Sequence, residues 1–423
     1  MPQVPIVSGV RVKNGSFQKA HPVNLHHKLV ESGVSKGELV HTRGARTIGN
    51  GPGTDRGGIE WNGVQYRVMG NQLCSVGATG TVTQLGSVGS DGLQVGFAVG
   101  FDRIAIRSAT RLYYYNGSAL NQVTDPDLGA SLDVAWIDSF FVSTDGTNTV
   151  VDNLNNPLSW GPLRYGSAES DPDAITGIAN LNEELVIFGR YTIEFQRNVG
   201  GNGYPFQVIQ GANIPYGCIS AQAKCRIGPT YAFVGGSRNE PVGVYLIANG
   251  AATRISDEEI DGVLADCSDL KAISLEARKF GDEQHLILHA GNVSAGIAMK
   301  ASEQAHDYLW HRLEGANGGR YRPRNVVYLG GQYFVGDAAS SKVGVLEKDL
   351  SAHFDEEPGW RFDAGLLYAD GQGNTLAPAL LLSEIEISGQ FPVTPTAVFF
   401  SMTRDGELWS REVSRRTTGQ RGE

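Results

Sequence analysis

The chain has 423 residues, a hydrophobic content of 41% and a net charge of −10, so it can bury a large core and is not a basic nucleic-acid-binding protein. Glycine is abundant (55 residues) without a three-residue period, which excludes collagen and indicates many tight turns. The N-terminus lacks a secretory apolar core and no run of 18 apolar residues occurs, so we expect a protein made in the cytoplasm without a membrane span.

The first part of the chain, residues 1–55, is predicted to be an extended, partly ordered arm. It contains the loop-like stretch RGARTIGNGPGTDRGG. Residues 1–60 hold eight Lys and Arg against four Asp and Glu, so this end is basic. The arm is also rich in histidine (His21, His26, His27 and His41), which suits an interaction surface or, as an alternative, a metal site. Its glycine run has no strand–turn–helix context, so a linker explains it better than a phosphate loop.

Repeats dominate residues 56–357. A polar or glycine turn precedes a strongly apolar strand at seven positions: Gly63, Asp102, Asp138, Glu183, Gly228, Gly281 and Gly331. The intervals are 39, 36, 45, 45, 53 and 50 residues, and each unit combines alternating and continuous apolar segments. Repeats of this length with three or four strands predict an all-β fold, a β-propeller of about seven, possibly six, blades.

Two short helices are predicted within this repeat region. The stretch Ser256 to Leu270 has a capping-box spacing, with Ser256 as N-cap and Glu259 three residues later, although a polar loop is a close alternative. A brief second helical pattern lies near Ala301 to His306. Residues 358–423 form another β series, which predicts a small C-terminal β-module or the strands that close the last blade.

Candidate chemistry is sparse. The four cysteines (Cys74, Cys218, Cys225 and Cys267) are widely spaced, which predicts buried free thiols. His285 and His289 fall on one face of a strand, where a metal could bind, but no carboxylate or cysteine accompanies them at ligand spacing and cross-strand packing is favoured. Two turns, STDGTNTV and TRDGELW, are similar to the Asp-box hairpins of sialidases, yet Asp-Gly is common in hairpins for conformational reasons alone.

Several stretches resemble the tail-hub, or packaged-DNA stabilisation, protein family of short-tailed phages such as Salmonella phage P22. The most specific is PDAITGIANLNEELVIFGRYTIEFQRNVG; HPVNL, DRGGIEWNGVQYRVMGNQL, VYLIANGAATRISDEEID and FFSMTRDGELWSRE follow the family in the same order. The resemblance implies a non-enzymatic virion component without a cofactor, built as a homohexameric ring. Its partners would be further copies of itself, the portal-adaptor (head-to-tail connector) protein, the tail needle and tailspikes. DNA would pass through its lumen without sequence-specific binding.

Under this hypothesis the basic arm binds the adaptor ring. The residues expected to do so are His21, Pro22, Val23, Asn24, Leu25, Arg43 and Arg46. Deleting Met1 to Gly49 is expected to abolish incorporation into tails while the propeller stays folded. No catalytic, cofactor-binding or metal-binding residue is assigned. A sialidase-like glycoside hydrolase and a propeller interaction scaffold outside phages remain the alternatives.

Overall fold

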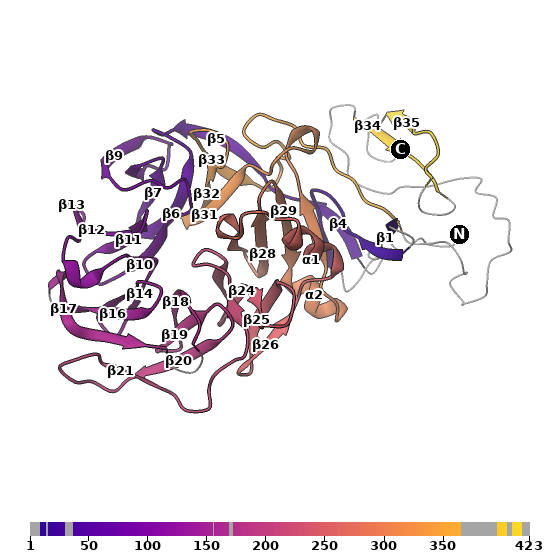
Figure 1. Cartoon of the computed structure of the whole chain (residues 1–423). Coiled ribbons are helices and arrows are strands. Elements are labelled where there is room, and N and C mark those ends of the chain that lie inside the picture. Colours follow the sequence, from indigo (N-terminus) through magenta and orange to yellow (C-terminus); the bar gives the residue numbers. More distant parts are fainter. Residues whose placement is uncertain are drawn as a thin grey trace. The chain divides into compact units, whose positions relative to one another are not determined.

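The computed structural model describes residues 9–13, 16–29, 37–154, 156–168, 172–364, 396–403 and 408–416. These residues divide into two compact units, Met1–Pro22 with Phe362–Glu423, and Val23–Arg361. The larger unit is an all-β propeller (Figure 1). No helix in the described ranges is both long and apolar enough to cross a membrane.

Seven antiparallel sheets form the blades of the propeller, so the predicted β-propeller is confirmed and the blade count is seven. Each of the first four blades is a four-stranded meander. They are blade 1 (β6 Asp55–Trp61, β7 Val64–Met69, β8 Gln72–Val76, β9 Val82–Ser87), blade 2 (β10 Gly96–Val99, β11 Ile104–Ser108, β12 Arg111–Tyr115, β13 Leu120–Gln122), blade 3 (β14 Asp133–Ile137, β15 Phe140–Thr144, β16 Asn148–Asn153, β17 Asn156–Ser167) and blade 4 (β18 Ile175–Leu181, β19 Glu184–Gly189, β20 Ile193–Asn198, β21 Phe206–Val208).

Of the other three blades, blade 6 keeps this pattern and blades 5 and 7 vary it. They are blade 5 (β22 Gly217–Cys218, β23 Lys224–Ile227, β24 Thr230–Gly236, β25 Gly243–Ala248, β26 Ala251–Arg254), blade 6 (β27 Ser274–Phe280, β28 Glu283–Ala290, β29 Val293–Ala298, β30 Trp310–Leu313) and blade 7 (β31 Pro323–Leu329, β32 Gln332–Asp337, β33 Lys342–Glu347, β5 Gly44–Asn50). In blade 5 the first position is split, because β22 and β23 both pair with β24.

All seven marker turns lie where the first strand of a blade, or β23 in blade 5, reverses into the next one. Several of these reversals need a positive φ, for example 53° and 66° at Asn182 and Glu183 and 67° at Gly281. Glycine, asparagine and aspartate tolerate that conformation best, and two-residue hairpins of this kind match the twist of the strands they join. The repeat in the sequence is therefore a repeat of one hairpin.

Blade 7 closes the ring with a strand from the N-terminal region. β5 pairs antiparallel with β33, so that Ala45 lies opposite Leu346 and Gly44 opposite Glu347 (Figure 1). The sequence pattern predicts residues 44–50 as part of the arm and the glycine-rich residues 51–54 as a linker, whereas the structure shows β5 of blade 7 and the turn into β6. The observed boundary thus differs from residue 55, because strand pairing with a distant segment gives no local sequence signal.

A hairpin and two short α-helices are added to the blades of the propeller. The hairpin of β3 (Leu25–Leu29) and β4 (Gly37–His41) contacts blade 6 and α2 (Met299–Ala305), close to the second predicted helix. α1 (Glu258–Ala265) confirms the first predicted helix, but its N-cap is Asp257, whose side chain accepts the Ile260 amide at 3.1 Å. The predicted cap Ser256 instead donates to Asp261 at 2.7 Å.

The hydrophobic core runs between neighbouring blades. Its largest cluster joins blades 4, 5 and 6 and includes the fully buried Phe188, Phe233 and Trp310. Face-to-face packing of this kind explains the continuous apolar middle strands, since both of their faces are covered. The smaller unit contains the hairpins β1 (Gly9–Lys13) with β2 (Ser16–Ala20) and β34 (Ala397–Phe400) with β35 (Val413–Arg416). Residues 365–395, 404–407 and 417–423 of the predicted C-terminal β series lie outside the described residues.

Candidate functional site

The interior of the propeller carries buried ion pairs rather than a purely apolar lining. Arg67 donates to both carboxylate oxygens of Asp55, at 2.7 and 3.1 Å, and neither side chain is exposed. The same guanidinium donates to the Asn325 carbonyl at 2.8 Å, so it joins blade 1 to blade 7. Each charge is compensated by a partner, as a buried charge must be.

A second pair joins blades 3 and 5. Lys224 Nζ lies 2.6 Å from Asp133 Oδ2, and the same oxygen accepts the backbone N–H of Ile178 at 2.9 Å. In blade 6, Glu276 pairs with Arg278 and accepts the Asn325 amide. Both carboxylates accept a backbone N–H group from another blade, and Lys224 also reaches Asp133 from another blade, so these contacts fix blades to one another.

The β3–β4 hairpin is held onto the propeller by the residues that precede it. Asn24 Nδ2 donates to the Gly359 carbonyl at 2.7 Å, and its Oδ1 accepts the Glu314 amide at 3.0 Å. Val23 bridges to both Arg312 and Arg361. Val23 and Asn24 therefore hold their own chain in place.

The predicted adaptor-docking residues are consequently divided between buried and exposed positions. His21, Pro22, Val23, Asn24 and Leu25 are buried in this structure. Arg43 places its guanidinium 4.3 Å from the centre of the Phe280 ring, a cation–π contact. Arg46 is exposed and pairs with Glu347 at 2.7 Å. Their role toward a partner stays a prediction.

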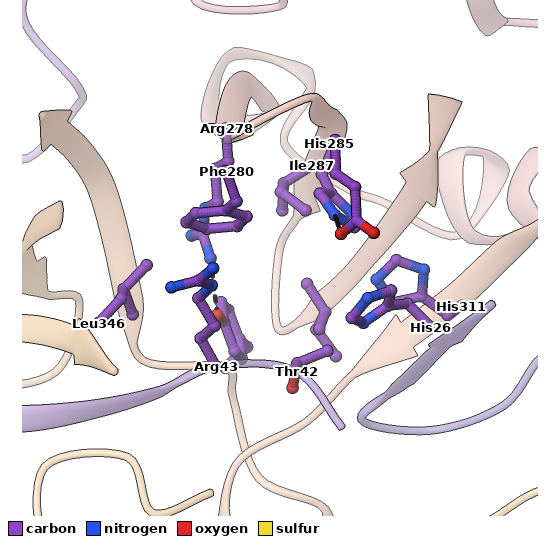
Figure 2. Close-up of a pocket in the computed structure, with 12 residues that line it drawn as sticks. His26, Thr42, Arg43, Arg278, Phe280, His285, Ile287, His311 and Leu346 are labelled. Carbon is purple, nitrogen blue, oxygen red and sulfur yellow. Dashed lines mark hydrogen bonds and ion pairs between the residues drawn. The ribbon is translucent and has the colours of Figure 1, made fainter. Parts of the chain in front are cut away.

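A small cavity of about 50 Å³ lies between the arm, blade 6 and blade 7. Figure 2 shows the imidazoles of His26, His285 and His311 gathered at one side of it, with Arg43 and Phe280 at the other. The His26 and His285 rings meet edge to face with centroids 4.9 Å apart. Two histidines that are 259 positions apart in the sequence thus become neighbours (285 − 26 = 259).

Glu283 completes this group. On β28 it lies two residues before His285, so both side chains project from the same face of the strand. Its Oε2 is 3.8 Å from His285 Nε2, and donor atoms of His26, Glu283 and His285 all lie within 4.8 Å of one another. The prediction that no carboxylate accompanies His285 at ligand spacing is therefore wrong, and the Glu-x-His alternation of β28 is the sequence signal for it. We call these three residues the His26 cluster.

The cluster's charge state follows from its surroundings. Burial and then repulsion from His285 lower the pKa of His26 to about 3, so this imidazole is neutral at neutral pH. The interaction with His285 holds the pKa of Glu283 below its ordinary value, so the carboxylate is charged. A neutral imidazole and an anionic carboxylate are the forms that coordinate a metal ion.

His289 does not join the cluster. It faces Ser294 across the sheet, with Nδ1 2.8 Å from the hydroxyl oxygen, and stacks on Tyr321. Burial lowers its pKa well below the ordinary value. His289 therefore packs across the sheet, and the predicted alternative of one metal held by His285 and His289 together is wrong, because His285 lies beside His26 and Glu283 instead.

The cysteines and the Asp-box-like turns have structural surroundings. All four cysteines are free; Cys74 and Cys218 are buried, and burial raises the pKa of each of these thiols to about 11. In the STDGTNTV turn, Asp145 accepts the backbone amides of Thr147 and Asn148 at 2.8 and 2.7 Å. That contact stabilises the turn itself. In the second turn, residues 404–407 lie outside the described ranges.

The chain is similar in sequence to a phage protein and in structure to other solved proteins. The chain is 27% identical to tail hub protein gp10 of Salmonella phage P22, over 97% of this chain and 89% of that protein. Among solved structures it is similar to PorZ of Porphyromonas gingivalis (11% identity, TM-score 0.43, 90% of this chain and 45% of that chain) and to the Pan2 WD40 domain of Neurospora crassa (10%, 0.45, 74% and 98%). These structural likenesses carry no argument about function. The family described as "Bacteriophage P22 Gp10, beta-propeller" matches residues 2–351, and the chain belongs to this family of phage β-propeller proteins.

Proposed function

We propose that the protein is a structural subunit of a short phage tail and occupies the position of the tail hub. The observation that carries this proposal is the match to a tail hub protein along 97% of the chain, which also covers 89% of that relative. Similarity over the whole length includes the N-terminal region and the C-terminal unit as well as the propeller. It therefore favours the same structural role over reuse of an isolated propeller.

The interior of the propeller supports a structural rather than a catalytic role. A glycoside hydrolase needs two convergent carboxylates, one of which donates a proton to the leaving group. Asp55 and Asp133 instead form short ion pairs with Arg67 and Lys224 and accept further hydrogen bonds. These contacts hold blades 1, 3, 5 and 7 together, as a rigid wall subunit requires.

The finer role we propose is a homohexameric ring below the portal-adaptor complex. This ring would extend the DNA channel, help to retain packaged DNA, and bind the tail needle and tailspikes. Identical subunits can form such a ring by repeating one heterologous contact until it closes. The net charge of −10 suits passage of DNA, because an acidic lumen repels phosphates. A hexamer with a basic lumen would contradict this part.

The N-terminal contact with the adaptor ring needs a revised test. Deleting Met1 to Gly49 would remove most of β5, the closing strand of blade 7, and so would not leave the propeller intact. Arg46 is the better target, because its side chain is half exposed and its ion pair lies at the surface. We expect Arg46→Ala to weaken binding to the adaptor ring, with Arg111→Ala, an exposed arginine of blade 2, as the matched control.

Electron microscopy tests the whole proposal. Purified protein would be mixed with DNA-filled, tail-less heads that already carry their adaptor ring, and the tail vertex would be averaged. New six-fold density on the adaptor is the expected result. If the heads stay bare while circular dichroism shows folded β protein, the hub proposal is wrong. Turnover of sialosides or other glycosides in the same preparation would favour the hydrolase, and capture of a host peptide would favour a scaffold.

A further inference from the structure

We propose that the His26 cluster binds one divalent transition-metal ion, with Zn²⁺ as the matching probe. The three ligands are an imidazole of the arm hairpin, His26, and the Glu283 carboxylate and His285 imidazole of β28. The metal would fasten the hairpin to blade 6. This inference does not depend on the hub proposal, since it concerns contacts within one chain.

The donor set selects the class of metal. Two imidazole nitrogens and one carboxylate oxygen suit Zn²⁺ and its neighbours in the first transition row, whereas Mg²⁺ and Ca²⁺ prefer oxygen ligands alone. The negative charge of Glu283 partly neutralises the dication. This lowers the electrostatic cost of placing the metal ion in a partly buried site. Water can fill the fourth position, because Glu283 keeps 32% of its side chain exposed.

The distances are close to those of a coordinated set. Zn²⁺ holds its ligands at about 2.0–2.2 Å, so tetrahedral donor atoms stand roughly 3.3 Å apart. In the cluster the Glu283 and His285 donors are already 3.8 Å apart and the widest separation is within 4.8 Å. Side-chain rotation of the half-exposed Glu283 can supply the remaining approach without moving the strand.

The surrounding protein holds the two imidazoles in place. His285 lies opposite Arg278 and Ala298 on the two neighbouring strands, and its ring packs against Phe280 with centroids 5.8 Å apart. His26 is fixed by the pairing of β3 with β4, where it lies opposite Val40. Preorganised ligands lose less conformational entropy when the ion binds.

A bound ion would close a very long loop. His26 and Glu283 are 257 residues apart in sequence (283 − 26 = 257), and β3 otherwise contacts β29, β30 and α2. A clip across such a separation removes conformational freedom from the opened state. The expected consequence is that metal stabilises the attachment of the hairpin and not only the site itself.

The experiment uses the full, untagged chain, because a polyhistidine tag would bind the same ions. Isothermal titration with ZnCl₂ should give one site per chain, and Co²⁺ substitution should give the visible absorption bands of a four-coordinate site. Mg²⁺ at the same concentration should not compete. No binding, or several weak sites of similar affinity, would overturn the proposal.

Three single substitutions test the ligands: His26→Gln, Glu283→Gln and His285→Gln. Each should weaken Zn²⁺ binding at least about tenfold, since loss of a mere supporting contact around a metal already costs that much. His41→Gln is the matched control, because His41 is an exposed histidine of the same hairpin outside the cluster and should leave affinity unchanged. Equal affinity in all four variants would show that the ion binds elsewhere.

Folding of the variants is checked by thermal unfolding without metal. Glu283→Gln keeps the proposal testable even if the buried His285 cannot be replaced, because Glu283 is half-exposed and glutamine has the same shape. Zn²⁺ should also slow hydrogen exchange of the β3 amides in the unmodified protein and not in Glu283→Gln. Zinc binding without this protection would refute the fastening role.

Discussion

The ion pair between Arg67 and Asp55 makes a strong quantitative prediction about what holds the ring closed. The Arg67 guanidinium reaches Asp55 within blade 1 and the Arg324 and Asn325 carbonyls of blade 7, at 3.3 and 2.8 Å. Blade 7 contains the closing strand β5. Arg67→Met keeps much of the side-chain volume and removes only the charge and the donors.

The expected cost follows from burial. Removing one partner of a buried pair leaves the other charge without compensation, which costs about 3–5 kcal/mol. Asp55 and Arg67 have no exposed side-chain surface, so water cannot replace the lost partner. Arg46→Met is the matched control, because Arg46 makes an ion pair of the same 2.7 Å length with Glu347 at the surface. Exposed pairs contribute about 0–1 kcal/mol.

Equilibrium unfolding in urea, followed by tryptophan fluorescence, measures both changes. We expect a large fall in the free energy of unfolding for Arg67→Met and a small one for Arg46→Met. The double variant Asp55→Asn with Arg67→Met should cost less than the sum of its single variants, since no charge is then left buried. A cost below about 1 kcal/mol for Arg67→Met, or strict additivity in the double variant, would refute the reasoning.

Three further substitutions test other contacts. Burial raises the pKa of Asp152 from 3.8 to about 7, so the folded state keeps a proton that the unfolded state loses, and stability should fall by up to about 4 kcal/mol as the pH rises through that window. Asp152→Asn should remove this fall in urea titrations at pH 4 and pH 8; an unchanged pH dependence would contradict the assignment. Trp310 donates its indole N–H to the Ile255 carbonyl at 2.7 Å, so Trp310→Phe should cost about 1–3 kcal/mol in the same assay, and a neutral variant would count against that bond. A Cβ at Gly336 would come within 2.1 Å of a buried carboxylate of blade 1, so Gly336→Ala should lower the melting temperature, whereas Gly359→Ala meets open space and should not; equal melting temperatures would refute the packing.

The sequence by itself determined the type of fold and limited the number of blades to six or seven, of which the structure has seven. Turns such as Asn182-Glu183 and Gly281 can be predicted from the local sequence, because a positive φ restricts which residues can occupy them. The continuous apolar run of β28 is likewise a local property, set by burial of both faces. The N-cap of α1 was misplaced by one residue, from Ser256 to Asp257, since both side chains can accept the same kind of hydrogen bond.

Only the tertiary structure decided which distant segments meet. Nothing in the sequence of Gly44–Asn50 distinguishes the closing strand of blade 7 from an arm, because its hydrogen bonds go to β33, about 300 residues later. The same holds for His26, which no spacing rule connects to Glu283 and His285. The periodicity of apolar residues predicts only how a segment folds with its neighbours in sequence. Pairing of β5 with β33 closes the ring and creates the last blade, whereas packing of the β3–β4 hairpin on blade 6 creates the histidine cluster.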